Sequence, residues 1–150
     1  MSTRYRCRFL RQSDGAALVE FAILCSVFML IVLGILEFGL LWYTKQVITN
    51  ATREGARYGI AWDTQADGTR KAPKDFSPTI EAVVNNYITG RIPSVNCTVT
   101  VENNTAFQTG TKGSDLIVRV SCTNAYDLLG GFIPSLRNIT FNAQTVMKCE

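Results

Sequence analysis

Residues 15–21, GAALVEF, place one carboxylate, that of Glu20, at the start of a long apolar run. From Ala16 to Leu36, Glu20 is the only charged side chain. A helix of this length rises about 31 Å, which is enough to cross the hydrocarbon core of a bilayer. A carboxylate in such a helix costs about 2.5–3.5 kcal/mol on insertion scales, so it calls for a partner or a purpose. The sequence therefore predicts a membrane-spanning helix in which Glu20 has a specific role.

The segment before this helix, residues 1–15, is short and basic. It contains four arginines and one aspartate, namely Arg4, Arg6, Arg8, Arg11 and Asp14. These residues account for the formal net charge of +3, because the remaining 11 basic and 11 acidic residues cancel. Basic flanks stay in the cytoplasm, so we expect a cytoplasmic amino terminus and a translocated carboxyl-terminal part. The rest of the chain has no basic excess, which argues against nucleic-acid binding.

The apolar helix is expected to leave the membrane at an aromatic edge formed by Leu41, Trp42 and Tyr43. This edge predicts a transmembrane helix over residues 16–43. Apolar residues then recur at spacings of three and four as far as Tyr58, which predicts an amphipathic extension of the same helix over residues 44–59, with Gly59 as its end. Glu37, near the outer edge, is expected to reach water by snorkelling.

Residues 60–150 predict a small domain outside the membrane. A polar loop over residues 63–77 precedes a short amphipathic helix that begins at Pro78, with Ser77 as its cap, and ends at Gly90. Three strands with alternating apolar residues follow, over residues 96–103, 115–126 and 138–148. The expected fold class is α+β, with a long membrane-spanning helix, one short helix and a three-stranded antiparallel sheet.

The cysteines add one expectation about this sheet. A hairpin centred near residues 108–110 places Val101 opposite Val118 and Cys97 opposite Cys122. Outside the membrane, Cys97, Cys122 and Cys149 lie in an oxidising compartment, where at most one disulfide can form among the three. We favour a bridge between Cys97 and Cys122. A bridge between Cys122 and Cys149 is the second possibility, and free thiols are the third.

The composition disfavours an enzyme. The chain has no histidine, which removes the commonest general base and the usual zinc ligand. It also has no glycine-rich phosphate loop, no CxxC pair and no cluster of carboxylates in the outer domain. We therefore expect no catalytic residue, no metal and no cofactor, and an anchored enzyme is the third choice of function.

With Gly15, Glu20 and Phe21 in place, the start of the chain resembles a type IV prepilin processing site. Its details look like those of the TadE-like minor pilins of tight adherence (Flp) pili. The resemblance implies that a prepilin peptidase cuts between Gly15 and Ala16, which leaves Glu20 as the fifth mature residue and Phe21 as the next. Residues 51–59, ATREGARYG, are also similar to the segment that follows the anchor in this family. The added domain favours a minor subunit over the very short major pilin.

Two groups of residues are candidates for assembly contacts. The cut creates an α-amine on Ala16, which is a natural partner for Glu20 on the same helix or on an adjacent subunit. On the extension, Arg53, Glu54 and Arg57 either contact a partner subunit or form local pairs.

The resemblance implies a structural minor pilin or pseudopilin of a Tad/Flp adhesive pilus. Its implied partners are the prepilin peptidase, other minor and major pilins, the assembly platform in the inner membrane and the lipid bilayer. It implies a bacterial inner-membrane, single-pass protein whose outer domain is periplasmic, or extracellular in the pilus. The alternative is an uncleaved single-pass membrane protein with a periplasmic ligand-binding or regulatory domain.

Overall fold

The computed structural model of this 150-residue chain describes residues 12–61, 63–92, 95–123 and 139–149. The arginine-rich segment and the predicted strand ends at Tyr126 and Asn138 lie outside these ranges. The chain divides into two compact units, Met1–Leu36 and Glu37–Glu150. Each unit is described by itself below.

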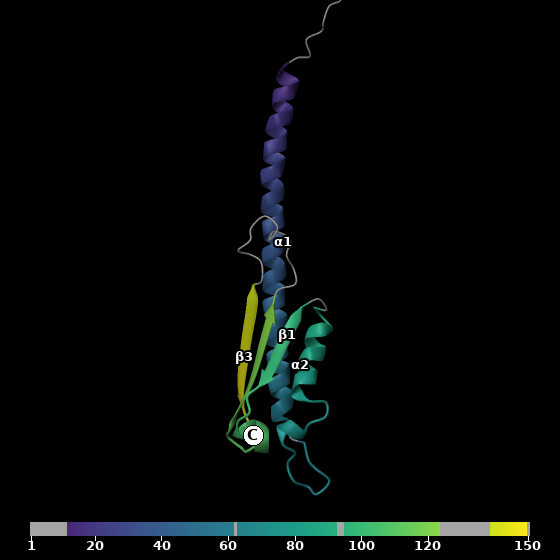
Figure 1. Cartoon of the computed structure of the whole chain (residues 1–150), viewed down its shortest axis with the longest axis vertical. Helices are drawn as coiled ribbons and strands as arrows, with labels where there is room; N and C mark the ends of the chain where they lie inside the picture. Colours follow the sequence, from purple (N-terminus) through teal and green to yellow (C-terminus); the bar gives the residue numbers. More distant parts are fainter. Residues whose placement is uncertain (1–11, 62, 93–94, 124–138, 150) are drawn as a thin grey trace, which may run out of the picture. The chain divides into compact units, whose positions relative to one another are not determined.

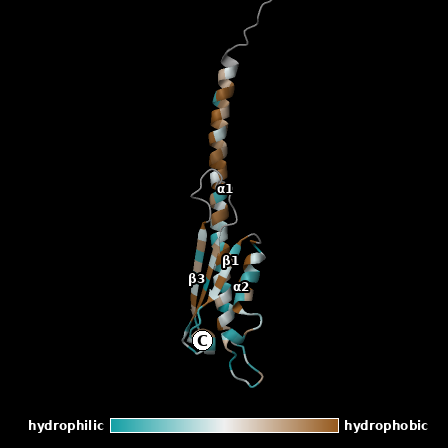
Figure 2. Ribbon diagram, in the orientation of Figure 1, coloured by the Kyte–Doolittle hydropathy of each residue, from teal (hydrophilic) through white to brown (hydrophobic). Residues whose placement is uncertain are grey.

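Helix α1, Gln12–Ile60, contributes to both units. Its apolar residues are concentrated in its first half, as the hydropathy colouring in Figure 2 shows. From Gly15 onward the helix is long and apolar enough to cross a membrane. The prediction of one long apolar helix is confirmed. Gly59 does not end it, however, since the helix continues to Ile60.

The second unit contains an antiparallel sheet in the order β1-β2-β3, with β1 at Asn96–Val101, β2 at Asp115–Thr123 and β3 at Thr140–Lys148. The expected register between the first two strands is confirmed, with Val101 opposite Val118 and Cys97 opposite Cys122. Figure 1 shows this sheet beside the second part of α1. The predicted α+β fold class is therefore confirmed.

The connection between β1 and β2 differs from the simple hairpin that we expected. It contains a short helix, α3, Thr105–Thr109. The Asn104 side chain fixes the start of α3, because its Oδ1 accepts a hydrogen bond from the Phe107 amide at 3.1 Å and its Nδ2 donates to the Asp115 carbonyl at 2.7 Å. Gly110 ends α3 in the left-handed conformation with φ 63°. The loop thus folds locally without changing the strand register.

Helix α2, Ile80–Thr89, follows a short 3₁₀ helix, η1, Pro73–Asp75. Its cap is Thr79, whose Oγ1 accepts a hydrogen bond from the Ala82 amide at 3.2 Å. The predictions that Ser77 caps the helix and that Pro78 is its first residue are therefore wrong, because Thr79 satisfies the free amide at the helix start. The expected end at Gly90 is correct.

The second part of α1 and helix α2 pack against one face of the sheet. Each of these three elements contributes buried apolar side chains to one core, from α1 (Ile48, Ala51, Ala56), α2 (Ile80, Val84, Ile88) and β2 (Leu116, Val118, Val120). Thr52 is also buried, and its hydroxyl shares a 2.8 Å hydrogen bond with the hydroxyl of Thr145 on β3. The apolar face of the amphipathic extension of α1 is therefore buried against the core of its own domain.

Two glycines let α1 approach these elements closely. A Cβ atom added to Gly55 would overlap Val84 Cγ2. A Cβ atom added to Gly59 would overlap Leu116 and would lie 2.7 Å from Ile80 Cδ1. The missing side chains at these two positions therefore determine how near the helix lies to α2 and β2.

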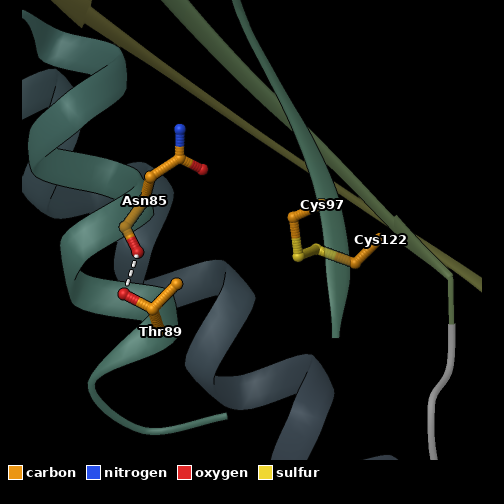
Figure 3. The surroundings of a disulfide bond; sticks show 4 residues. All are labelled: Asn85, Thr89, Cys97 and Cys122. Carbon is orange, nitrogen blue, oxygen red and sulfur yellow. Dashed lines mark hydrogen bonds between the residues drawn. A yellow bond between two sulfur atoms is a disulfide. The ribbon is translucent and has the colours of Figure 1, made fainter. Parts of the chain in front are cut away.

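A disulfide joins Cys97 on β1 to Cys122 on β2. It lies opposite the part of α2 that carries Asn85 and Thr89, where the Thr89 hydroxyl donates to the Asn85 carbonyl at 2.9 Å (Figure 3). Cys149 is a free thiol with 2% of its surface exposed. The bridge therefore has the pairing that the strand register favoured.

Removing this bridge by the double substitution Cys97→Ala and Cys122→Ala is expected to lower the free energy of unfolding by about 2–4 kcal/mol, because the unfolded chain loses a cross-link. Denaturant unfolding of the purified full chain in detergent micelles, followed by near-ultraviolet circular dichroism, measures this loss. Cys25→Ala is the control, since Cys25 is a free thiol in the first unit. An unchanged unfolding midpoint in the double variant would contradict the stabilising role.

Candidate functional site

The candidate processing site lies at the beginning of α1. Residues 15–21 are all exposed and helical, and nothing lies within 4 Å of the position that a Gly15 side chain would occupy. The bond between Gly15 and Ala16 lies inside the helix, which begins upstream at Gln12. The structure thus brings Gly15, Ala16, Glu20 and Phe21 together on one short, accessible stretch of helix.

Glu20 and Ala16 are one turn apart, so they lie on the same face of α1. The Glu20 side chain is exposed and forms no ion pair with any residue that the structure describes. A charge on a lipid-facing helix is costly, and pairing it with an opposite charge lowers this cost. Within the described residues, no cation is paired with the Glu20 carboxylate.

Phe21 belongs to a larger exposed apolar surface, with 68% of its own surface accessible. Most of the large apolar side chains between Leu18 and Leu36 are exposed to a similar degree. A continuous apolar surface of this extent indicates burial in lipid or against other helices. This feature is consistent with anchoring by a single membrane pass.

Arg53, Glu54 and Arg57 lie on the exposed side of α1, facing away from the buried Thr52 and Gly55. None of the three forms an ion pair with another described residue. The local pairs that we considered from the sequence are therefore not formed in the described part of the chain. All three side chains are accessible to another molecule.

Glu37 does not behave as we expected from the sequence. Only 3% of its surface is exposed, so the prediction that its carboxylate snorkels to water is wrong. Thr44, two turns further along α1, is fully buried, and its hydroxyl donates to the Leu40 carbonyl at 2.9 Å. Tertiary packing buries Glu37 and Thr44. The periodicity of a single helix does not predict such burial, because it does not specify which other parts of the chain will contact the helix.

Sequence reasoning also missed a groove between α1 and the start of β3. Its volume is about 340 Å³, and it is lined by the α1 residues Phe38, Leu41, Trp42 and Lys45 and the residues Thr140, Phe141 and Asn142. The Lys45 ammonium donates a hydrogen bond to the Asn142 carbonyl. In the sequence, Leu41 and Trp42 indicate one apolar side of this groove. The other side comes from residues 140–142, which lie about a hundred positions further along the chain, so the pattern around Trp42 does not predict that the two sides meet.

Titratable groups do not gather into a reaction centre in the part of the chain that the structure describes. No cluster of three or more histidine, cysteine, aspartate or glutamate residues suited to a metal is present there. The pKa of the exposed Asp67 carboxyl is lowered, chiefly because the Thr69 hydroxyl donates a hydrogen bond to it at 2.6 Å. That bond belongs to a local turn.

An exposed apolar helix that continues into a small sheet domain is consistent with a pilin-like protein that has a single membrane anchor. Comparison with known families gives the narrower assignment. Residues 15–57 match the family model described as TadE-like protein, so this segment is similar to that family. This family is pilus-associated and non-enzymatic. No curated protein and no solved structure matches the chain.

Proposed function

We propose that this chain is a minor pilin or pseudopilin of a Tad/Flp adhesive pilus, cut between Gly15 and Ala16 by a prepilin peptidase. The observation that carries this proposal is the family match, which begins at Gly15 and includes both Glu20 and the segment with Arg53 and Arg57. The exposed apolar surface of α1 supports it, because such a helix can insert into a membrane and later pack among other helices.

The proposed cut creates a positive charge that can pair with the Glu20 carboxylate. Hydrolysis of the bond after Gly15 releases a cationic α-amine on Ala16, one helical turn from Glu20. The amine of the same chain or of a neighbouring subunit then pairs with the carboxylate. Pairing between subunits fixes their axial register, because a helix shifted along its neighbour leaves one charge unpaired in lipid.

The same proposal assigns the compartments. Residues 1–15 form a cytoplasmic leader, residues 16–43 cross the bacterial inner membrane, and residues 44–59 extend the helix into the periplasm. Residues 60–150 form a periplasmic domain that becomes extracellular in the pilus. The disulfide between Cys97 and Cys122 supports this orientation, because disulfides persist in oxidising compartments. Arg53, Glu54 and Arg57 are then available to other pilins or to the assembly platform.

Mass spectrometry of the protein purified from its native cells tests the cut. We expect the mature chain to begin at Ala16 in cells with the prepilin peptidase and to keep its leader in cells without it. Gly15→Leu should block the cut, since it places a bulky side chain next to the scissile bond. Gly34→Leu is the control, because Gly34 also lies in the open part of α1.

An intact leader in wild-type cells would contradict this proposal. It would favour the alternative function, an uncleaved single-pass protein with a ligand-binding or regulatory outer domain. Cleavage that persists without the peptidase would likewise rule out the proposed enzyme as the processing partner.

A further inference from the structure

We propose that the groove between α1 and β3 binds an anionic phospholipid of the outer leaflet, with the lipid phosphate at Lys45. This inference rests on the membrane insertion in the proposed function. The groove lies within the second unit, and each of its lining residues belongs to the part of the chain that the structure describes.

The apolar wall of the groove is built from one stripe of α1. Phe38, Leu41, Trp42 and Lys45 are spaced by three or four residues, so they share one face of the helix. Phe38 and Trp42 are 64% and 62% exposed, and their ring centroids lie 6.2 Å apart. Phe141 lines the groove from β3. These rings provide an apolar surface of the kind that lies at the edge of a membrane.

The polar end of the groove carries a cation with spare hydrogen-bonding capacity. Lys45 is exposed, and it forms no ion pair with a described residue. Its ammonium has three donors, and one of them is used by the Asn142 carbonyl. That bond holds the ammonium at the rim of the groove and leaves two donors for phosphate oxygens.

The order of these groups along α1 identifies the occupant. Moving away from the apolar segment, the helix presents Phe38 first, then Trp42, and finally Lys45. A phospholipid in the outer leaflet presents its acyl carbons, its glycerol and its phosphate in the same order. The groove volume of about 340 Å³ falls in the range of small-molecule sites, about 300–1,000 Å³. It therefore suits the phosphate, the glycerol and the first acyl carbons of one lipid.

Tryptophan quenching by brominated lipids tests this proposal on the full chain in phosphatidylcholine vesicles. A Trp62→Phe background leaves Trp42 as the one reporter, because the chain has two tryptophans. Brominated phosphatidylglycerol and brominated phosphatidylcholine are titrated in parallel at equal mole fractions. We expect the anionic lipid to associate about fivefold more strongly at Trp42, the preference that one lysine near an anionic surface confers.

Three variants assign this preference to the groove. Lys45→Gln should abolish it, and Lys45→Arg should keep it, which shows that the charge rather than the lysine packing is responsible. Lys112→Gln is the matched control, since Lys112 is exposed in a turn before β2 and does not line the groove. This control should keep the full preference.

Equal quenching by the two lipids in the Trp62→Phe background would overturn the proposal. So would an equal loss of preference in Lys45→Gln and Lys112→Gln, which would indicate a general electrostatic effect. Absence of quenching by either lipid would show that protein, such as a second copy of the chain, covers Trp42. The mass of the amino terminus in the same samples reports cleavage independently, so failure of the lipid site is distinguishable from failure of the pilin proposal.

Discussion

Replacing Glu20 by glutamine is expected to reduce incorporation of the chain into pili at least about tenfold, while its insertion into the membrane is unchanged. The amide keeps the size of the side chain but removes the negative charge that attracts an α-amine. An unpaired charge in the apolar span costs about 2.5–3.5 kcal/mol, and each 1.4 kcal/mol is about a factor of ten in an equilibrium. Losing a substantial part of that pairing energy is therefore sufficient for the expected decrease.

Immunoblots of sheared pili and of membrane fractions measure the two quantities separately. Glu81→Gln is the matched control, because Glu81 is exposed on α2 and the same change there leaves the apolar helix untouched. The mass of the Glu20→Gln chain should show that the bond after Gly15 is still cut, which separates processing from docking. Normal amounts of the variant in pili would remove the charge-pairing mechanism.

Replacing Gly55 or Gly59 by alanine is expected to destabilise the second unit by about 1–3 kcal/mol for each substitution. The added methyl group would overlap Val84 Cγ2 in the first case and Leu116 in the second. Both neighbours belong to the core, where they are fully buried, so neither can move aside without opening a gap elsewhere. The overpacking should exceed the gain in helix propensity that alanine brings.

Gly39→Ala supplies the matched control for these two variants. Gly39 lies in the same helix, and nothing occupies the space within 4 Å of its added Cβ atom. There we expect a stabilisation of about 0.5–1 kcal/mol, because alanine is the better helix former. Thermal unfolding of the full chain in detergent compares the three variants. Equal melting temperatures for Gly39→Ala and Gly55→Ala would show that the close approach of α1 is not needed.

The strand register illustrates what could be predicted without the structure. Alternating valines and threonines place one face of each strand toward a core, and a slip of one residue would turn every apolar side chain to the solvent. That constraint, together with the position of the hairpin, is sufficient to place Val101 opposite Val118 and Cys97 opposite Cys122. The disulfide pairing remained one of three possibilities at that stage, since Cys149 also lies in the outer domain.

The start of α2 and the presence of α3 differ from the sequence-based predictions for another physical reason. Asn104 and Thr79 start their helices through single side-chain hydrogen bonds to backbone amides. Several nearby residues of the same chemical type compete for such roles, so Ser77 was an equally reasonable cap before the structure was known. Short helices such as α3 also carry too few residues to show a periodic apolar pattern.

The sequence by itself determined the long apolar helix, the single charge between Ala16 and Leu36 and the α+β class, because these follow from local periodicity and spacing. It also determined the match of residues 15–57 to the TadE-like family, which depends on the residue types at particular positions. Tertiary structure alone decided that Gly55 and Gly59 are points of contact, that Glu37 is buried and that Phe38 and Phe141 line one groove. Each of these features depends on atoms from distant parts of the chain meeting in space, and the pattern of a single segment does not specify its neighbours.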